Sequence, residues 1–143
     1  MDTQIIIGKE FVNKVVPLIE RAKESIKIIV FDWRLYQHDP SNPVSKLVLA
    51  LKGAIERGVR VQVLLSNDLV RAQLSTLGFE CKRLYSDKLV HAKIMLIDDR
   101  VAVIGSHNYT QNAFQMNLEV SVALDLYTRD NDLKEYFDHI WPL

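Results

Sequence analysis

The chain has 143 residues, of which 48% are hydrophobic and 25% charged, and 18 basic side chains balance 18 acidic ones. This composition is typical of one globular domain and argues against a disordered chain. A net charge of zero argues against a broad phosphate-binding surface, so any anion site must be local. The single cysteine, Cys81, excludes an intrachain disulfide and a cysteine zinc cluster.

The N-terminal part of the sequence predicts a strand, a helix and a second strand. Thr3–Gly8 reads as a short strand, and Ser25–Trp33 is a mostly apolar strand of the kind that is covered on both faces. Between them, apolar residues recur at helical spacing, at Phe11, Val12, Val15, Val16, Ile19 and Ala22. Pro17 lies inside this pattern, so the helix is expected either to kink or to have an irregular first half.

A polar loop precedes the second predicted helix. Asn42 and Pro43 suit its N-cap and first position, and Gly58 suits its end. The apolar stripe of this helix consists of Val44, Leu47, Val48, Leu51, Ala54 and Ile55.

The alternation continues with the strand Val59–Ser66. Asn67 or Asp68 can cap a short helix that ends near Gly78, and Phe79–Tyr85 is the next predicted strand.

The C-terminal part predicts two strands on either side of Asp98–Arg100 and a short helical turn after Asn108. Leu118–Leu124 alternates with the period of a strand. An amphipathic closing helix is marked by Leu133, Tyr136, Phe137 and Ile140. Residues 1–143 therefore predict a single α/β domain with a central mixed sheet flanked by helices on both faces.

No segment predicts secretion or membrane insertion. The N-terminus lacks a basic region followed by a long apolar run, and no span reaches membrane length. As written, the chain is expected to be cytoplasmic without stable membrane association, although a removed leader or a larger parent protein would escape this reasoning.

Four polar side chains are concentrated in one predicted hairpin. Residues two apart on a strand share a face, so His91 and Lys93 are expected to point the same way, roughly 7 Å apart. Ser106 and Asn108 return on the second strand of the hairpin. A strand that only fills a core does not need all four.

The turn decides which of these residues are opposite each other. A two-residue turn at Asp98–Asp99 puts His91 opposite Ser106, whereas a turn at Asp99–Arg100 puts His91 opposite Asn108. Either register brings the two polar ends together, with directly opposed Cβ atoms about 5 Å apart.

This combination of side chains suits a phosphoryl group. His91 supplies a nucleophile or proton carrier near neutral pH, and Lys93 a compact cation for a phosphate oxygen. Ser106 and Asn108 add hydrogen-bond donors, and Gly105 is expected to let the backbone approach an anion closely. One histidine without clustered carboxylates suits a metal site poorly, so the reaction is expected to require no metal or other cofactor.

A carboxylate completes the predicted site. Glu119 shares a strand face with Ser121 and Ala123, and the other face carries Leu118, Val120, Val122 and Leu124. Glu119 is expected to accept the second ring N–H of His91 and so to fix its tautomer.

The spacing of these residues resembles a known signature. His91-x-Lys93-x-x-x-x-Asp98, then six residues, then Gly105-Ser106-x-Asn108 is similar to the HKD motif of the phospholipase D superfamily. Asn117 and Glu119 match the Asn-x-Glu that follows the motif in many members. The layout of the elements before the motif is similar too, so the resemblance extends over residues 3–141.

The resemblance implies a mechanism without a metal. In this family one histidine attacks phosphorus and forms a phosphohistidine, a second HKD histidine protonates the leaving oxygen, and water resolves the intermediate. Lysines and asparagines of both motifs hold the phosphoryl oxygens. By this resemblance His91 is the nucleophile or acid, Lys93 and Asn108 bind phosphate, and Ser106 is a further donor. Asp98 is expected to be structural.

The chain has one HKD motif, and His38, His107 and His139 lie in no second copy. The resemblance to small single-motif bacterial nucleases therefore implies a homodimer in which the two copies of His91 face each other across a twofold axis.

The loop after the second predicted strand is a candidate substrate-binding segment. Trp33, Arg34 and Tyr36 follow a strand end, where sites of α/β proteins usually form, and Tyr109 adjoins the motif. The alternative interpretation is a surface loop anchored by Trp33.

Three functions remain open at this stage. The first is a metal-independent nuclease that cleaves DNA or RNA. The second is a phospholipid hydrolase or transferase, which needs a membrane-facing apolar segment. The third is a catalytically silent nucleic-acid-binding domain of a larger restriction or repair protein, for which a broken motif would be the signal, and this motif is intact.

Overall fold

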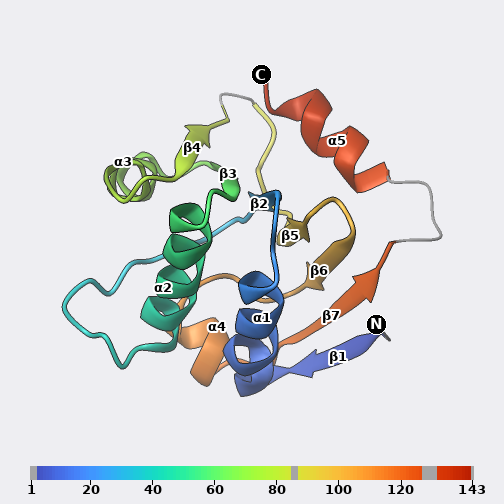
Figure 1. Cartoon of the computed structure of the whole chain (residues 1–143). Coiled ribbons are helices and arrows are strands. Elements are labelled where there is room, and N and C mark those ends of the chain that lie inside the picture. Colours follow the sequence, from blue (N-terminus) through green and yellow to red (C-terminus); the bar gives the residue numbers. More distant parts are fainter. Residues whose placement is uncertain (1–2, 85–86, 127–131, 143) are drawn as a thin grey trace.

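The computed structural model describes residues 3–84, 87–126 and 132–142 (Figure 1). Seven strands of these residues form one sheet in the order β1-β7-β6-β5-β2-β3-β4. Their bounds are β1 Gln4–Ile7, β2 Ser25–Ile29, β3 Arg60–Leu65, β4 Glu80–Arg83, β5 Ile94–Ile97, β6 Val101–Gly105 and β7 Val120–Asp125. The pairs β2–β3 and β3–β4 are parallel and the other four are antiparallel, which confirms the predicted mixed sheet.

Helices cover both faces of the sheet, as predicted. Their bounds are η1 Gly8–Glu10 (a 3₁₀ turn), α1 Phe11–Glu20, α2 Pro43–Glu56, α3 Asp68–Thr76, α4 Gln111–Gln115 and α5 Asp132–Ile140. Residues of α1, α2, α3 and α4 share one large core with alternate strand residues such as Ile28 and Val63. Phe137 of α5 packs on the other face against Ile29 and Leu64.

The helix boundaries follow the local signals. The Asn42 side chain accepts the Val44 N–H at 3.0 Å, and Asn67 accepts the Val70 N–H at 3.1 Å, so both are N-caps. Gly58 adopts a φ of 93° directly after α2, where a residue with Cβ would be strained. Pro17 lies inside α1, whose α-helical turns are preceded by the 3₁₀ turn η1 rather than starting regularly.

The turn between β5 and β6 corrects the predicted registers. Ile97 pairs with Val101, so Asp98, Asp99 and Arg100 form a three-residue turn, and both two-residue registers were wrong. Asp98 and Asp99 adopt φ values of 54° and 52°. This conformation is fixed from outside the hairpin, because the Asp98 carboxylate accepts backbone N–H bonds of 2.8–3.2 Å from residues 23–25.

Strands end earlier than the pattern predicts, at one edge of the sheet. β2 stops at Ile29 instead of Trp33, because the chain leaves the sheet there and Trp33 pairs with Tyr109 in an isolated bridge. His91 and Lys93 precede β5 instead of lying on it. The predicted functional residues therefore lie just beyond strand ends.

Among the described residues, no helix is both long and apolar enough to cross a bilayer. The predicted cytoplasmic location is not tested by this finding and stays a prediction.

Candidate active site

The antiparallel strands bring four chain segments to the same edge of the sheet. Ile29 at the end of β2 pairs with Ile94 at the start of β5, and Ile94 pairs with Ile104 near the end of β6. Gly105 in turn pairs with Ser121 at the start of β7. Residues directly after β2 and β6 therefore meet residues directly before β5 and β7. These are the segments that carry the predicted site.

His91 and Lys93 are close together at this edge. Lys93 Nζ lies 3.3 Å from Nδ1 and 3.4 Å from Nε2 of His91. The two ring nitrogens flank Cε1, so nearly equal distances place the ammonium over the ring and not along either lone pair. His91 is exposed. The exposed imidazole therefore lies beside a cation that can hold a phosphate oxygen.

Phe31 belongs to this cluster and is a residue that was not predicted from the sequence. Its ring centroid lies 4.9 Å from that of His91 and 5.4 Å from Lys93 Nζ. Phe31 comes two residues after the end of β2, at the edge where β2 and β5 are neighbours. Its position after an apolar strand was a usable signal, but the partner of that strand could not be read from the sequence.

Asn108 is held by the backbone of the neighbouring loop. Its Oδ1 accepts the Asp32 N–H at 3.1 Å. The Asp32 carbonyl accepts the Tyr109 N–H, and the Tyr109 carbonyl accepts the Arg34 N–H, both at 3.0 Å. With its oxygen fixed in this way, Asn108 presents its two N–H donors to the site.

Glu119 contacts Ser106 and not His91. Ser106 Oγ donates to Glu119 Oε1 at 2.5 Å and accepts the Val120 N–H at 3.0 Å. The Asn117 amide donates to the other Glu119 oxygen at 3.1 Å. The expected bond to His91 is absent from the described residues of one chain, because the carboxylate is turned toward β6. Ser106 must release Glu119 before its hydroxyl can donate to a phosphate.

Gly105 is needed for strand packing. A Cβ at this position would lie 2.3 Å from Cα and Oγ of Ser121 and 2.5 Å from the Val120 carbonyl oxygen. The structure thus gives a reason for a glycine that the sequence did not predict, the close approach of Ser121 and Val120 of β7, and the approach of an anion to Gly105 stays a prediction.

His107 is buried and joins three segments. Its Nε2–H donates to the Gly8 carbonyl at 2.9 Å, so Nδ1 is the acceptor for the Ser121 hydroxyl at 2.7 Å. Burial lowers the pKa of His107, against the opposing effects of the Gly8 carbonyl and Glu119. The neutral ring thus ties the end of β1 to the strands that carry Ser106 and Glu119.

Two residues of the predicted substrate loop are core residues. Trp33 is 1% exposed and Tyr109 is 2% exposed, and their rings meet edge to face at 5.0 Å. Packing against Phe11 and Phe79 removes them from any substrate, so their predicted contact role was wrong. Arg34 is exposed, whereas Tyr36 is half-buried and its Oη accepts the Gln111 N–H at 3.2 Å.

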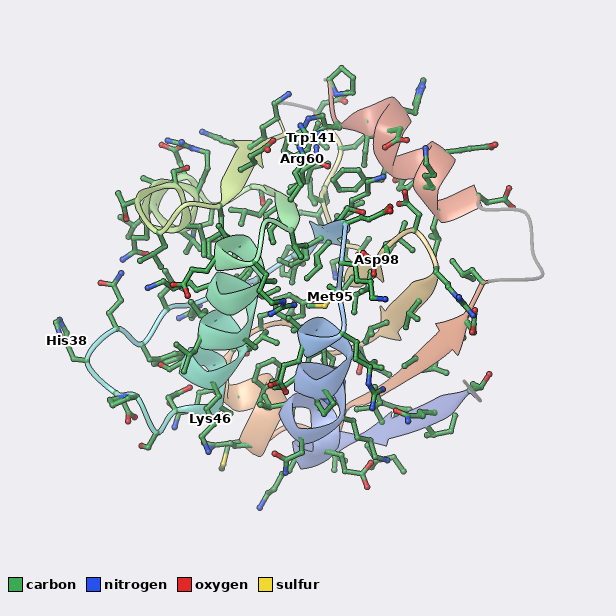
Figure 2. The ribbon with its side chains drawn as sticks, viewed as in Figure 1. His38, Lys46, Arg60, Met95, Asp98 and Trp141 are labelled. Atoms are coloured by element: carbon green, nitrogen blue, oxygen red, sulfur yellow. The ribbon has the colours of Figure 1, made fainter. Side chains whose placement is uncertain are left out.

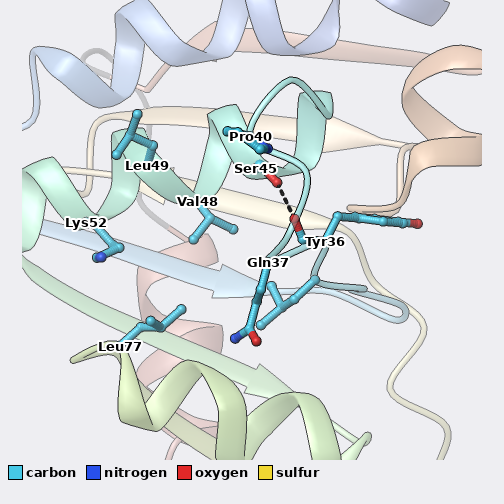
Figure 3. Close-up of a pocket in the computed structure, with 9 residues that line it drawn as sticks. Tyr36, Gln37, Pro40, Ser45, Val48, Leu49, Lys52 and Leu77 are labelled. Atoms are coloured by element: carbon cyan, nitrogen blue, oxygen red, sulfur yellow. Dashed lines mark hydrogen bonds between the residues drawn. The ribbon is translucent and has the colours of Figure 1, made fainter.

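The same loop borders a recess of about 330 Å³ beside α2 (Figure 3). It is lined by Leu35, Tyr36, Gln37, Pro40, Ser45, Val48, Leu49, Lys52 and Leu77. None of His91, Lys93 or Asn108 belongs to this lining, so the recess is separate from the polar cluster.

In the part of the chain that the structure describes, no three side chains of His, Cys, Asp or Glu are grouped to hold a metal ion. The thiol of Cys81 is half-buried, and burial raises its pKa to about 12. A protonated thiol is a poor nucleophile, which leaves His91 as the nucleophile candidate at this edge.

Comparisons with known sequences find the same fold family along most of the chain. A family model described as "Cardiolipin synthase, PLD-like domain" matches residues 15–141. A cardiolipin synthase A of Pseudomonas putida is 32% identical in an alignment of 108 positions that covers 68% of this chain and 22% of that protein. A mitochondrial cardiolipin hydrolase of Xenopus tropicalis is 28% identical in an alignment of 135 positions that covers 90% of this chain and 60% of that protein. The chain thus spans about a fifth of the synthase.

Solved structures with this fold include small proteins of similar length. Nuc from Salmonella typhimurium, a phospholipase D family member, has a TM-score of 0.76 at 20% identity, over 99% of this chain and 95% of that one. NucT from Helicobacter pylori has a TM-score of 0.74 at 20% identity, over 99% and 96%. TrmBL2, an archaeal chromatin protein, has a TM-score of 0.61 at 19% identity and is covered over 53% of its length.

Proposed function

Because this chain belongs to the phospholipase D-like family of phosphodiester-acting enzymes, we propose that it is a metal-independent nuclease whose nucleophile is His91. The observation that carries the proposal is the convergence of His91, Lys93 and Asn108 at one sheet edge, with His91 exposed. Lys93 and the Asn108 amide supply the positive and polar contacts that a phosphoryl group needs.

The proposed reaction has two steps. A ring nitrogen of His91 attacks phosphorus, the bond to the leaving oxygen breaks, and that oxygen takes a proton from the partner subunit's His91. Water then attacks the phosphohistidine and gives its proton to the same partner histidine, which restores both rings. Lys93 and Asn108 hold the non-bridging oxygens through both steps, where negative charge accumulates.

The second histidine comes from a second copy of the chain, and a bare sheet surface supports this. Helix α5 covers β2 and β3 on its face of the sheet, while Ile5, Ile7 and Val120 on that face are 55%, 58% and 56% exposed. Ile7 pairs with Val120, and Leu118 next to Glu119 is fully exposed. Such an apolar patch is typical of an interface, and it adjoins the polar cluster. We propose a homodimer with the two copies of His91 facing each other across the twofold axis.

Nucleic acid is the proposed substrate because the motif resembles that of small single-motif bacterial nucleases. The fold of this chain also extends over nearly the full length of two small proteins, Nuc and NucT. The second candidate is a phospholipid hydrolase or transferase. It is favoured by the sequence similarity to the cardiolipin enzymes and by exposed Met116 and Leu118 beside Glu119, which could enter a lipid surface. A silent nucleic-acid-binding domain of a larger protein would not need the ordered contacts of His91 and Asn108.

The test is hydrolysis in excess EDTA of labelled single- and double-stranded DNA and RNA, and of cardiolipin vesicles, by wild type and His91→Ala. Cleavage of a nucleic acid by wild type alone supports the proposal, and His91→Ala is expected to keep its fold and dimer. Cleavage of cardiolipin alone replaces nuclease by lipid hydrolase. Equal rates for both proteins would overturn the mechanism.

A further inference from the structure

We propose that Phe31 is a positioning residue that holds the side chains of His91 and Lys93 next to each other for attack on phosphorus. The inference rests on the proposed function for its meaning in catalysis, and on the contacts of Phe31 for its structural part. Phe31 follows directly after Val30, which is fully buried, and is itself half-buried.

His91 has little other support in the monomer. It is exposed, it precedes β5 and so lies outside the ladder of strand hydrogen bonds, and Glu119 is engaged with Ser106 and Asn117. Among the described residues, the side chains that contact its ring are Lys93 and Phe31. A nucleophile held by so few contacts depends on each of them.

The ring of Phe31 contacts both members of the pair at once. It is tilted by 47° to the His91 ring at 4.9 Å, and the Lys93 ammonium lies 5.4 Å from its centroid. An aromatic face attracts a cation and packs against a second ring, whereas an aliphatic side chain can do only the latter weakly. Phe31 therefore keeps the ammonium beside the imidazole while no phosphate is there to attract it.

This arrangement predicts that catalysis depends on the aromatic ring of Phe31 and not only on the size of an apolar side chain. Phe31→Leu preserves an apolar side chain but removes the ring face, whereas Phe31→Tyr keeps it. We expect kcat/KM of Phe31→Leu to fall on the order of ten- to a hundredfold, the scale on which small misplacements of reacting groups act. Phe31→Tyr is expected to stay close to wild type.

The matched control is Trp141→Leu. Trp141 also presents a ring to a lysine, with Lys82 Nζ 4.7 Å from its centroid, but the aromatic ring that it stacks on, at 5.6 Å, is Phe137 of α5. Loss of this ring is expected to leave the rate per folded protomer unchanged. A general effect of removing an aromatic residue would lower both rates.

The readout that does not depend on turnover is the NMR signal of the His91 imidazole, assigned by its loss in His91→Gln. In Phe31→Leu the His91 signals are expected to move because the ring current of Phe31 is gone, while those of His38 and His139 stay. Unmoved His91 signals, or wild-type kcat/KM in Phe31→Leu, would overturn the proposal. If wild type shows no turnover on any phosphodiester, the proposed function fails, and the NMR comparison still decides whether the Phe31 ring contacts His91.

Discussion

Asp98 and Ser25, 73 residues apart, exchange two hydrogen bonds. The Asp98 carboxylate accepts the Ser25 N–H at 3.0 Å, and the Ser25 carbonyl accepts the Asp98 N–H at 2.7 Å. The same carboxylate accepts the N–H groups of Lys23 and Glu24. Asp98 therefore fixes the start of β2, and it follows the end of β5 whereas His91 precedes its start (Figure 2 labels Asp98).

Replacement of Asp98 is expected to reduce stability and not the chemistry. Asp98→Ala leaves three backbone donors without their acceptor, which costs about 1–3 kcal/mol in the free energy of unfolding. Urea unfolding measures this loss, with Asp87→Ala as the control for a lost surface carboxylate. A variant as stable as wild type but with a much lower rate per folded protomer would assign Asp98 a direct role in the reaction.

Gly105→Ala is expected to destabilise the protein because its Cβ would overlap Ser121. Forcing an atom into packed strands costs about 1–3 kcal/mol. Gly53→Ala is the matched control, since a Cβ there meets only the end of the Arg57 side chain, at 3.9 Å, and alanine favours a helix by about 1 kcal/mol. The two substitutions should change the unfolding midpoint in opposite directions. A neutral Gly105→Ala would contradict the contact with β7.

Because His107 is buried as a neutral ring, we expect the free energy of unfolding to decrease in mild acid. Its pKa is lowered by burial in the folded protein, so below the ordinary value of about 6.5 the unfolded chain binds a proton that the folded chain does not. The stability contributed by the neutral ring is complete above pH 6.5 and is lost as the pH falls from there toward the folded pKa. The free energy of unfolding between pH 7.5 and 5.5 should decrease more in wild type than in His107→Gln. The control is His38→Gln in an exposed loop, and equal pH slopes in wild type and His107→Gln would contradict the assignment.

If the exposed apolar face around Ile7 is the dimer interface, a charged side chain placed on it should prevent dimerisation. Ile7→Lys is expected to shift the protein from dimer to monomer and to lower its activity, because a lysine cannot be buried unpaired in an apolar interface. Leu69→Lys on α3 is the control, as Leu69 is 70% exposed and lies on the other side of the sheet. Light scattering measures the mass. A fully active monomer, whether wild type or Ile7→Lys, would contradict the shared site.

Local signals made much of the fold predictable. The caps at Asn42 and Asn67 depend on residues within one helical turn, and the structure has both. The alternation of strands and helices likewise follows from periodicity, which each segment carries by itself.

What failed depends on contacts between distant segments. The hairpin register is set by Asp98 binding a loop more than 70 residues away, which no turn preference reveals. Trp33 and Tyr109 are polar-tipped aromatic residues next to a motif, and only their mutual bridge shows that they are buried. Phe31 could not be predicted for the same reason, since its contact with His91 depends on the pairing of β2 with β5.

The most direct test of the central claim is to trap the intermediate on His91. Wild type is mixed with a substrate that carries ³²P at the scissile phosphate, quenched in alkaline denaturant to preserve phosphohistidine, and digested for mass spectrometry. We predict label on the peptide that contains His91, absent in His91→Ala and lost on a chase with unlabelled substrate. Turnover with no label at His91, or with label on another residue, would contradict the account.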